Sequence, residues 1–366
     1  MKSSPRSLAT RRNFLRRSGL AAAFAVSGAR AAGQPLQGKR VRWIVPFSPG
    51  GGYDVYSRLI QPFFERETGA RVVVDNVAGA GGRLGALHLE QARPDGRTLG
   101  ILAASGILVA GLTGEENAPD LLEDFTLLAR VVRNAHIWAT ARSGNLRSFE
   151  DVLSTSNQRP VLFTVNELGS TAFVGSVVAA DILGLRSGFV TGYPGSVESM
   201  LAAARGEVDI VAQSHETLAP PITQGELRSL LQISDEPIGD APMFRGVPLL
   251  GGDRGVAARL ARKRGADPKT AIRDSTALAN LIGEGRLIAG PPGLPAALRG
   301  YLEEVLARIC ASTAFLSAAA RAGRSVEYAS GESVRATLRG SAADAKRFVP
   351  VVLKATQEAR NGTIPQ

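Results

Sequence analysis

The chain has 366 residues, a formal net charge of +10, 41 glycines and one cysteine. Hydrophobic residues make up 44% of it and aromatic residues only 5%, so we expect an aliphatic α/β core, with room for two domains. A single cysteine excludes an internal disulfide, and three scattered histidines lack metal-ligand spacing, so no metal site is expected.

The first 31 residues resemble a twin-arginine signal peptide. Arg11 and Arg12 precede an apolar run from residue 20 to 26, and Ala29-Arg30-Ala31 offers an A-x-A cleavage site. The run is shorter than the roughly 20 residues that span a membrane. We therefore predict export to the periplasm with cleavage near Ala31.

The basic charge belongs largely to this signal. Seven positive residues and no acidic residue lie within it, so the remaining chain carries only +3. That balance gives no case for a nucleic-acid partner and weakly suits an anionic solute.

Strands and helices alternate after the signal. The pattern predicts strands at 40–47, 71–77 and 98–105, with helices at 53–69 and around 83–92. This order predicts parallel βαβ units, whose strands end at one edge of the sheet. The loops "PFSPGGGYD", "NVAGAGG" and "LAASGI" would then converge where α/β sheets bind ligands.

A second α/β series follows, with its own loops "VNELGSTAF", "GYPGS" and "AQSHET". Two lobes of similar make imply a cleft between them. We assign residues 36–137 and 284–366 to lobe 1 and residues 138–283 to lobe 2. The second boundary stays open across 235–283, which is rich in Gly, Pro and Arg and difficult to place.

Glycine at a helix start suits an anion. The first backbone N–H groups of a helix lack intrahelical partners, and glycine leaves them uncovered. Gly50 to Gly52 offer such a cradle in the first lobe, and Gly169, Ser170 and Thr171 offer another in the second. Two facing cradles could hold one or two carboxylates without a buried arginine. For the three glycines alone, a plain turn is the alternative.

Other chemistry finds little support. The P-loop and the G-x-S-x-G elbow do not occur, and Gly79-x-Gly81 fails as a dinucleotide fingerprint because residue 84 is Leu. Ser214, His215 and Glu216 are adjacent and would point apart, so no catalytic residue and no cofactor are expected. Asp54 is expected to cap the helix that follows Gly52, and Cys310 to be a buried, inert thiol.

Together these motifs resemble a known family. "PFSPGGGYD", "VVVDN", "GAGG", "PDGRTL", "VNELGSTAF" and "GYPGS…GEVDIVAQS" match, in order and spacing, the substrate-binding proteins of tripartite tricarboxylate transporters, the Bug family. The likeness runs from about residue 38 to the C-terminus and is looser after 234. It implies an α/β, periplasmic-binding-protein-like (type II) fold of two doubly wound lobes with a ligand cleft between them.

The resemblance also implies a function and a site. A small organic carboxylate would be captured and handed to membrane permease subunits, and we expect a monomer. The positions implied in ligand binding are Ser48, Gly50, Gly51, Gly52, Tyr53, Asp54, Ser105, Gly106, Gly169, Ser170, Thr171, Pro194, Gly195, Gln213 and Ser214.

This chain departs from the family at several positions. Tyr53 replaces a small hydroxyl residue and suggests larger or aromatic ligands, while Gln213 replaces a frequent acid and argues against amino acids. The family's "W-F-G" before its "A-P-x-G" turn is replaced by "GEGRLIAGPPG". Two alternatives remain open: an exported enzyme acting on a carboxylate, with Asp54 or His215 as base, and a ligand-sensing subunit of a signalling system.

Overall fold

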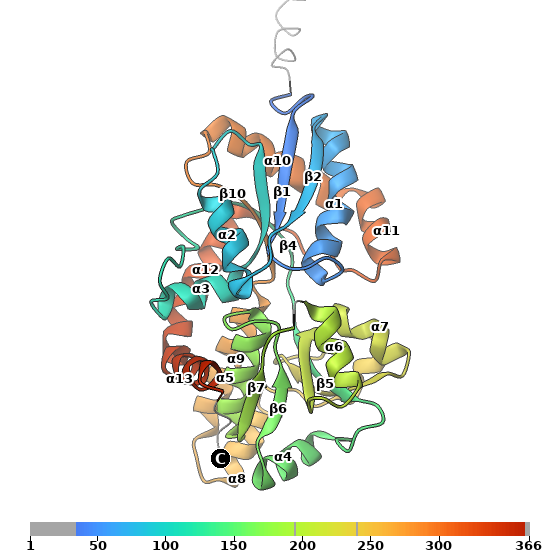
Figure 1. Cartoon of the computed structure of the whole chain (residues 1–366), viewed down its shortest axis with the longest axis vertical. Helices are drawn as coiled ribbons and strands as arrows, with labels where there is room; N and C mark the ends of the chain where they lie inside the picture. Colours follow the sequence, from blue (N-terminus) through green and yellow to red (C-terminus); the bar gives the residue numbers. More distant parts are fainter. Residues whose placement is uncertain (1–33, 194, 239–240, 363–366) are drawn as a thin grey trace, which may run out of the picture.

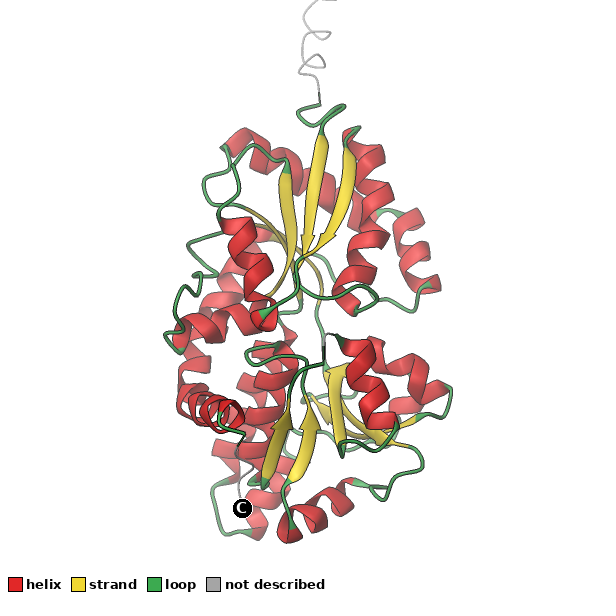
Figure 2. Ribbon diagram, viewed as in Figure 1, coloured by secondary structure: helices red, strands yellow, loops and turns green. Residues whose placement is uncertain are grey.

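The computed structural model describes residues 34–193, 195–238 and 241–362. The chain forms two lobes, one above the other in Figure 1, each with a central sheet flanked by helices (Figure 2). The strand order is β11-β4-β10-β3-β1-β2 in lobe 1 and β7-β6-β8-β5-β9 in lobe 2. The predicted two-lobed α/β fold is confirmed.

The lobe 1 sheet is built from both ends of the described chain. Its elements are β1 (Arg40–Val45), α1 (Gly52–Thr68), β2 (Arg71–Asn76), the 3-10 turn η1 (Ala80–Gly82), α2 (Arg83–Glu90), β3 (Thr98–Ala103), α3 (Ala104–Leu112), β4 (Thr126–Val132), β10 (Arg286–Gly290), α10 (Ala296–Ala311), α11 (Thr313–Arg321), β11 (Ala329–Ser330) and α12 (Gly331–Ala345).

The sheet of lobe 2 is built from the middle of the chain, and the last helix packs against this lobe. The lobe holds β5 (His136–Ala141), α4 (Phe149–Gln158), β6 (Val161–Thr164), α5 (Thr171–Leu183), β7 (Ser187–Val190), α6 (Ser196–Ala204), β8 (Ile210–Ser214), α7 (His215–Thr223), β9 (Leu227–Ile233), η2 (Pro242–Phe244), α8 (Val256–Lys263) and α9 (Pro268–Gly283); η3 (Lys346–Phe348) leads to α13 (Val349–Arg360), which packs against α5 and β7.

Both sheets are mixed rather than wholly parallel. The strands β1, β2 and β3 are parallel, as are β6, β7 and β8, but β10 and β5 run against their neighbours. The chain reaches β5 directly from β4, and it reaches β10 directly from α9 of lobe 2. A strand that enters a lobe from the other lobe starts at the edge where the parallel strands end, so it must run the opposite way.

Two expectations about local structure need correction. Ser105 and Gly106 were expected in a loop after the third strand, but α3 begins at Ala104 with no Gly or Pro before it to break the chain. The sequence "SVEYAS", residues 325–330, also predicts a strand, but only Ala329–Ser330 form one. The segment that was difficult to place, 235–283, contains α8 and α9, which pack on each other and on α5.

Packing joins the lobes on one side. A single cluster of buried hydrophobic side chains runs from lobe 1, through α3 and α12, to α5 and α9 of lobe 2. A separate cluster fills the far side of the lobe 1 sheet, where Trp43 meets Phe64 edge to face at 5.6 Å. Cys310 is buried there, as expected, and burial raises the pKa of its thiol to about 12. Among the described helices, none is both long and apolar enough to cross a bilayer.

Candidate functional site

A small cavity lies between the lobes where the parallel strands of both sheets end. Its volume is about 50 Å³, on a measure in which one water needs roughly 10–15 Å³. In this conformation it therefore has room for a few waters or one small acid group. It is lined by Phe47, Ser48, Gly51, Gly52, Tyr53, Asn134, His136, Asn166, Ser170, Thr171, Ala172, Gly195, Ser196, Gln213, Ser214, Thr217 and Arg286.

Four helices begin at this cavity. Their N-cap residues are Gly51 for α1, Ser170 for α5, Gly195 for α6 and Ser214 for α7, and all four line it. Only Ser170 caps its own helix, by accepting a hydrogen bond from the Phe173 amide at 3.2 Å. The other three N-caps supply no side-chain acceptor, so they leave donors at the helix starts for a ligand.

The turn before α1 is fixed by Asp54, which is not the N-cap that sequence predicts. It is the third residue of α1, and its carboxylate accepts hydrogen bonds from the Gly50 amide at 3.0 Å, from Arg58 at 2.9 Å and from Asn76 at 3.1 Å. Burial alone would raise the pKa of Asp54, but these bonds hold it below its usual value. This turn requires a φ of +85° at residue 50, which glycine adopts without strain.

Most of the implied site residues line the cavity. These are Ser48, Gly51, Gly52, Tyr53, Ser170, Thr171, Gly195, Gln213 and Ser214. Gly50, Asp54, Ser105, Gly106 and Gly169 do not line it. Gly50, Asp54 and Gly169 are next in sequence to lining residues, and Ser105 is hydrogen-bonded to the lining residue Thr171. Pro194 lies outside the described residues.

The residues behind the cavity join the lobes. Ser105 in lobe 1 donates a hydrogen bond to the Thr171 hydroxyl of lobe 2 at 2.8 Å. Gly106 lies so close to the loop before α5 of lobe 2 that a Cβ on Gly106 would stand 2.5 Å from the Gly169 carbonyl oxygen. Ser105, Gly106 and Gly169 therefore lie at the contact between the lobes.

Two aromatic rings narrow the cavity. Tyr53 and Phe47 pack with ring centroids 4.8 Å apart, and Arg286 lies over the Tyr53 ring at 5.0 Å. Burial raises the pKa of the Tyr53 phenol, which keeps it neutral. The side chain that suggested larger ligands thus occupies space in the cavity.

Sequence reasoning missed the polar wall of lobe 2. Asn166 accepts hydrogen bonds from Gln213 at 2.8 Å and from Ser199 at 3.0 Å, so the Gln213 amide is held in a fixed orientation. His136, the first residue of β5, also lines the wall. Burial first, then the nearby Arg286, lowers its pKa to about 3, so the ring is neutral at pH 7.

The main omission is Arg286, because sequence analysis expected no buried arginine. It is the first residue of β10 and only 2% exposed, and it pairs with Ala103 at the end of β3. A Cβ on Gly52 would overlap its guanidinium, which explains the glycine at that position. The sequence signal for this residue is the replacement of the family's "W-F-G" segment by "GEGRLIAGPPG", which contains Arg286.

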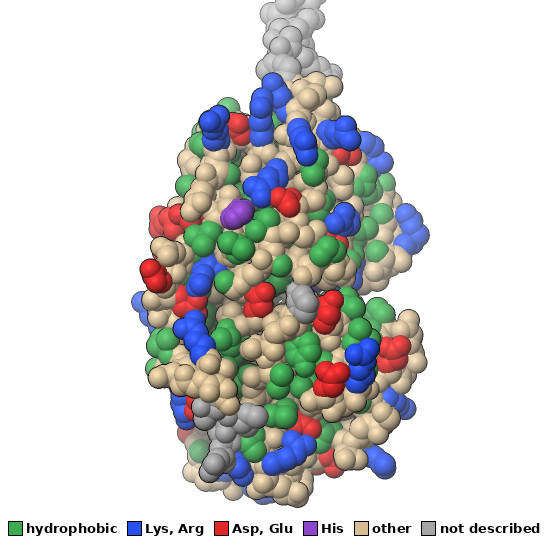
Figure 3. Space-filling view, in the orientation of Figure 1, with side chains coloured by type: hydrophobic (Ala, Val, Ile, Leu, Met, Phe, Trp, Pro, Cys, Tyr) green, Lys and Arg blue, Asp and Glu red, His purple; other side chains and the backbone are tan. Residues whose placement is uncertain are grey.

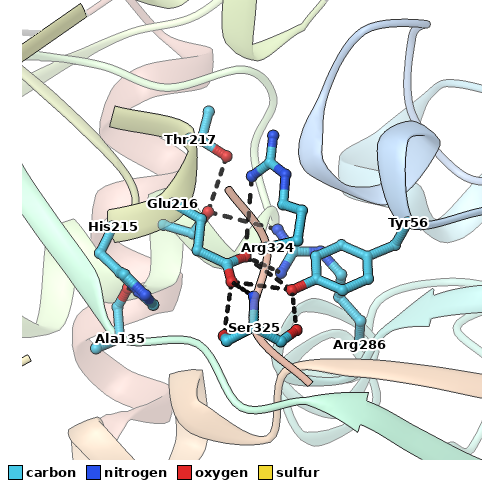
Figure 4. A network of polar contacts seen from close by, with 9 residues as sticks. Tyr56, Ala135, His215, Glu216, Thr217, Arg286, Arg324 and Ser325 are labelled. Atoms are coloured by element: carbon cyan, nitrogen blue, oxygen red, sulfur yellow. Dashed lines mark hydrogen bonds and ion pairs between the residues drawn. The ribbon is translucent and has the colours of Figure 1, made fainter. Parts of the chain in front are cut away.

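His215 takes a structural position. It begins α7, and its ring Nδ1 lies 3.3 Å from the Ala135 carbonyl oxygen on the segment that crosses between the lobes (Figure 4). It does not line the cavity.

Comparison with solved structures yields several two-lobed proteins. Rpa4515 of R. palustris with adipate has a TM-score of 0.68 and 21% identity, covering 86% of this chain and 97% of that one. MatC from Rhodopseudomonas palustris with bound malate gives 0.65 and 18%, covering 86% and 99%. The periplasmic binding protein BugD gives 0.68 and 18%, covering 87% and 98%. These matches establish the periplasmic-binding-protein fold.

Sequence comparisons point the same way. Protein BugT of Bordetella pertussis is 29% identical over 241 residues, which cover 63% of this chain and 73% of BugT. A UPF0065 protein from the tcbD-tcbE intergenic region of Pseudomonas sp. is 25% identical over 58% of this chain and 63% of its own length. The model of the tripartite tricarboxylate transporter family receptor, TctC, matches residues 57–252. Since that match spans more than half of the chain, this protein belongs to the TctC family of periplasmic solute-binding receptors, which are not enzymes.

Proposed function

We propose that this protein captures a small organic carboxylate in the cavity between its lobes and delivers it to the membrane subunits of a tripartite tricarboxylate-type transporter. One observation carries the proposal: four helix N-termini and one buried arginine meet at a single cavity.

The electrostatics of the cavity favour an anion. Each helix N-terminus carries a partial positive charge of about +0.5. Arg286 adds a full charge, and no Asp or Glu is among the described residues that line the cavity. His136 stays neutral and adds no charge, so the net charge of the described wall is positive.

The relatives support this class of ligand. Two solved proteins of the same fold hold adipate and malate, both of which are small organic acids. We assign the contacts of the ligand to the implied residues that line the cavity, above all Gly51, Gly52, Ser170 and Thr171. The small volume, with the Tyr53 ring inside it, favours a compact acid over a bulky aromatic one.

Delivery requires export. The segment with Arg11 and Arg12 lies outside the described residues, and we propose that it directs twin-arginine export to the periplasm, with cleavage near Ala31. We further propose that the exported protein acts as a monomer, because one chain supplies both walls of the cavity.

A thermal-shift screen tests the ligand class. The protein purified from the periplasm is heated with mono-, di- and tricarboxylates, and with the neutral amides of the same acids as controls. A ligand at 100 times its Kd adds about 2.7 kcal/mol to the free energy of unfolding. We expect at least one acid to raise the Tm and its amide to leave the Tm unchanged. Equal stabilisation by acid and amide would contradict the proposal.

A further inference from the structure

We propose that Arg286 contacts the acid group of the ligand and makes the cavity reject neutral analogues, and that Glu216 of the opposite lobe positions Arg286. This inference rests on the proposed function and adds a specificity-determining residue to it. It differs from the expectation that backbone amides alone hold the ligand.

The guanidinium of Arg286 is confined on several sides. It lies over the rings of Tyr53 and Tyr56, at 5.0 and 4.8 Å from their centroids. Its Nη2 is 3.4 Å from the Ser214 hydroxyl, and its Nη1 is 3.7 Å from a Glu216 carboxylate oxygen. Figure 4 shows it between Tyr56 and Glu216. The charge therefore sits at a fixed place in the wall of the cavity.

The hydrogen bonds of this guanidinium are incomplete. Among the described residues, its buried Nε and Nη1 have no hydrogen-bond partner. Buried donors without acceptors destabilise a folded protein, and donors on a charged group do so more strongly. The nitrogen that reaches the cavity is Nη2, since a Cβ on the lining residue Gly52 would overlap it. Its partner is the neutral Ser214 hydroxyl at 3.4 Å. A carboxylate in the cavity would give Nη2 a charge-assisted hydrogen bond, which is stronger than a neutral one.

Glu216 does not accept a hydrogen bond from Arg286, and most of its own hydrogen bonds are made by Oε1. It accepts hydrogen bonds from the Tyr56 hydroxyl at 2.9 Å and from the backbone amide and hydroxyl of Ser325, both at 2.7 Å. Its contact with Arg286 is an ion pair without a hydrogen bond. Glu216 thus holds the arginine by charge while leaving its donors available.

The charges of this buried cluster do not balance. Arg286 and Arg324 share one carboxylate, since the Arg324 Nη1 also lies 3.8 Å from Glu216. All three side chains are at most 10% exposed. Two arginines and one carboxylate leave the cluster with one positive charge in excess. A buried charge without a partner of opposite sign destabilises the folded protein. A ligand carboxylate next to Arg286 would neutralise that excess, whereas an amide would not.

The cluster also links the lobes. Glu216 belongs to α7 of lobe 2, while Tyr56, Arg286, Arg324 and Ser325 belong to lobe 1. Arg286 is therefore fixed by Glu216 only while the lobes are together. The acid group would be recognised in the closed form, and such differential binding favours closure.

Calorimetry with three variants tests the assignment. The probes are malate and adipate, each compared with its diamide. We expect Arg286→Gln to weaken binding of the acid by roughly 30-fold or more. The ratio of acid to amide affinity should fall towards one. Glu216→Gln should weaken the binding of the acid less and keep that ratio largely intact, because it mispositions the charge without removing it.

Melting temperatures without ligand, with the double variant Arg286→Gln/Glu216→Gln included, separate ligand contact from folding. In Arg286→Gln the Glu216 carboxylate keeps Arg324 as its partner, so the Tm of this variant should stay close to that of the wild type while acid binding weakens. The double variant leaves Arg324 buried without a carboxylate, so its Tm should fall while acid binding stays weak. Wild-type affinity in the double variant, or an unchanged acid-to-amide ratio in Arg286→Gln, would overturn the inference while the proposed function stands. If no acid of the thermal-shift screen binds the wild-type protein more tightly than its amide, both the inference and the proposed function are overturned.

Discussion

Two glycine-rich loops of lobe 1 have the same position in the fold and different surroundings. Gly51 and Gly52, between β1 and α1, line the cavity. Gly81, between β2 and α2, donates its amide hydrogen to the Glu167 carboxylate of lobe 2. A Cβ on Gly81 would lie 2.7 Å from the carbonyl oxygen of Leu168. Bare backbone at a helix start thus serves a solute in one loop and the opposite lobe in the other.

The two loops differ in whether their backbone donors already have an acceptor within the chain, not in the donors themselves. Both loops offer backbone donors at the end of a parallel strand, as expected for anion cradles. In the second loop the chain's own Glu167 occupies the donor, whereas in the first loop Asp54 shapes the turn from behind and leaves the front facing the cavity. Glycine content alone therefore does not identify a ligand site.

The largest effect is expected from a negative charge placed in the first loop, which tests whether that loop binds an anion. Gly51→Asp should abolish carboxylate binding, a loss of more than about 100-fold, because a second carboxylate at close range repels the ligand. The matched control is Gly51→Asn, which has nearly the same size without the charge and should bind more tightly than the Asp variant. Calorimetry with malate and adipate measures both, and equal affinities would contradict an electrostatic cavity.

A second prediction concerns the neutral wall of the cavity. The pKa of His136 is lowered to about 3 in the folded protein, so only the unfolded chain takes up a proton near pH 6.5. Stability from this group is present above pH 6.5 and is lost as the pH falls towards 3. Between pH 7 and 5 the loss is about 2 kcal/mol. Denaturant unfolding of the wild type and of His136→Gln at both pH values isolates the contribution of His136 to the free energy of unfolding. If the variant shows the same pH dependence as the wild type, the prediction is wrong.

The contact between the lobes can be tested with a single methyl group. Gly106 has ordinary helical φ, so Ala fits the helix, but its Cβ would stand 2.5 Å from the Gly169 carbonyl oxygen. Gly106→Ala should keep the lobes apart and weaken carboxylate binding by about 10-fold, which corresponds to 1.4 kcal/mol. The Tm without ligand should fall as well, because the added Cβ strains the packing of α3 on α5 that joins the lobes.

The control for this variant lies in the same helix. A Cβ on Gly111 would meet only the Pro119 carbonyl oxygen, at 3.9 Å, which is an ordinary contact. Gly111→Ala should bind like the wild type. Small-angle scattering of the two variants with ligand should show a larger radius of gyration for Gly106→Ala alone. The same radius in both would mean that the close approach is not needed for closure.

The smallest expected effect is on ligand size. Tyr53→Ser removes a ring from the cavity and the cation–π contact with Arg286. The longer adipate should gain a few-fold in affinity relative to malate, because the added space outweighs a contact of about 1 kcal/mol. Competition calorimetry gives the ratio directly, and a shift in favour of malate would contradict a size role for Tyr53.

The sequence allowed much of this arrangement to be predicted, for a physical reason. Parallel strands joined by helices end at a common edge, so loops such as those at Gly51 and Ser170 had to meet there. Arg286 and His136 escaped prediction because each begins an antiparallel strand that starts at the same edge. No local pattern tells a strand that enters from the other lobe from one that belongs to a βαβ unit. The division of the chain into lobe segments and the ligand contacts of the site stay predictions.

The continuous apolar packing through α3, α5, α9 and α12 restricts where a solute can reach the cavity. On that flank a channel for water or solute would require these packed helices to separate and expose their buried apolar side chains. On the opposite flank even a Cβ added to Gly50, just before α1, would only touch Val197 of α6, at 3.8 Å. The outline of the molecule is notched between the lobes on that side, near α7 and α11 (Figure 3). Under the proposed function, solute would enter and leave on that flank, and the membrane subunits would receive it from there.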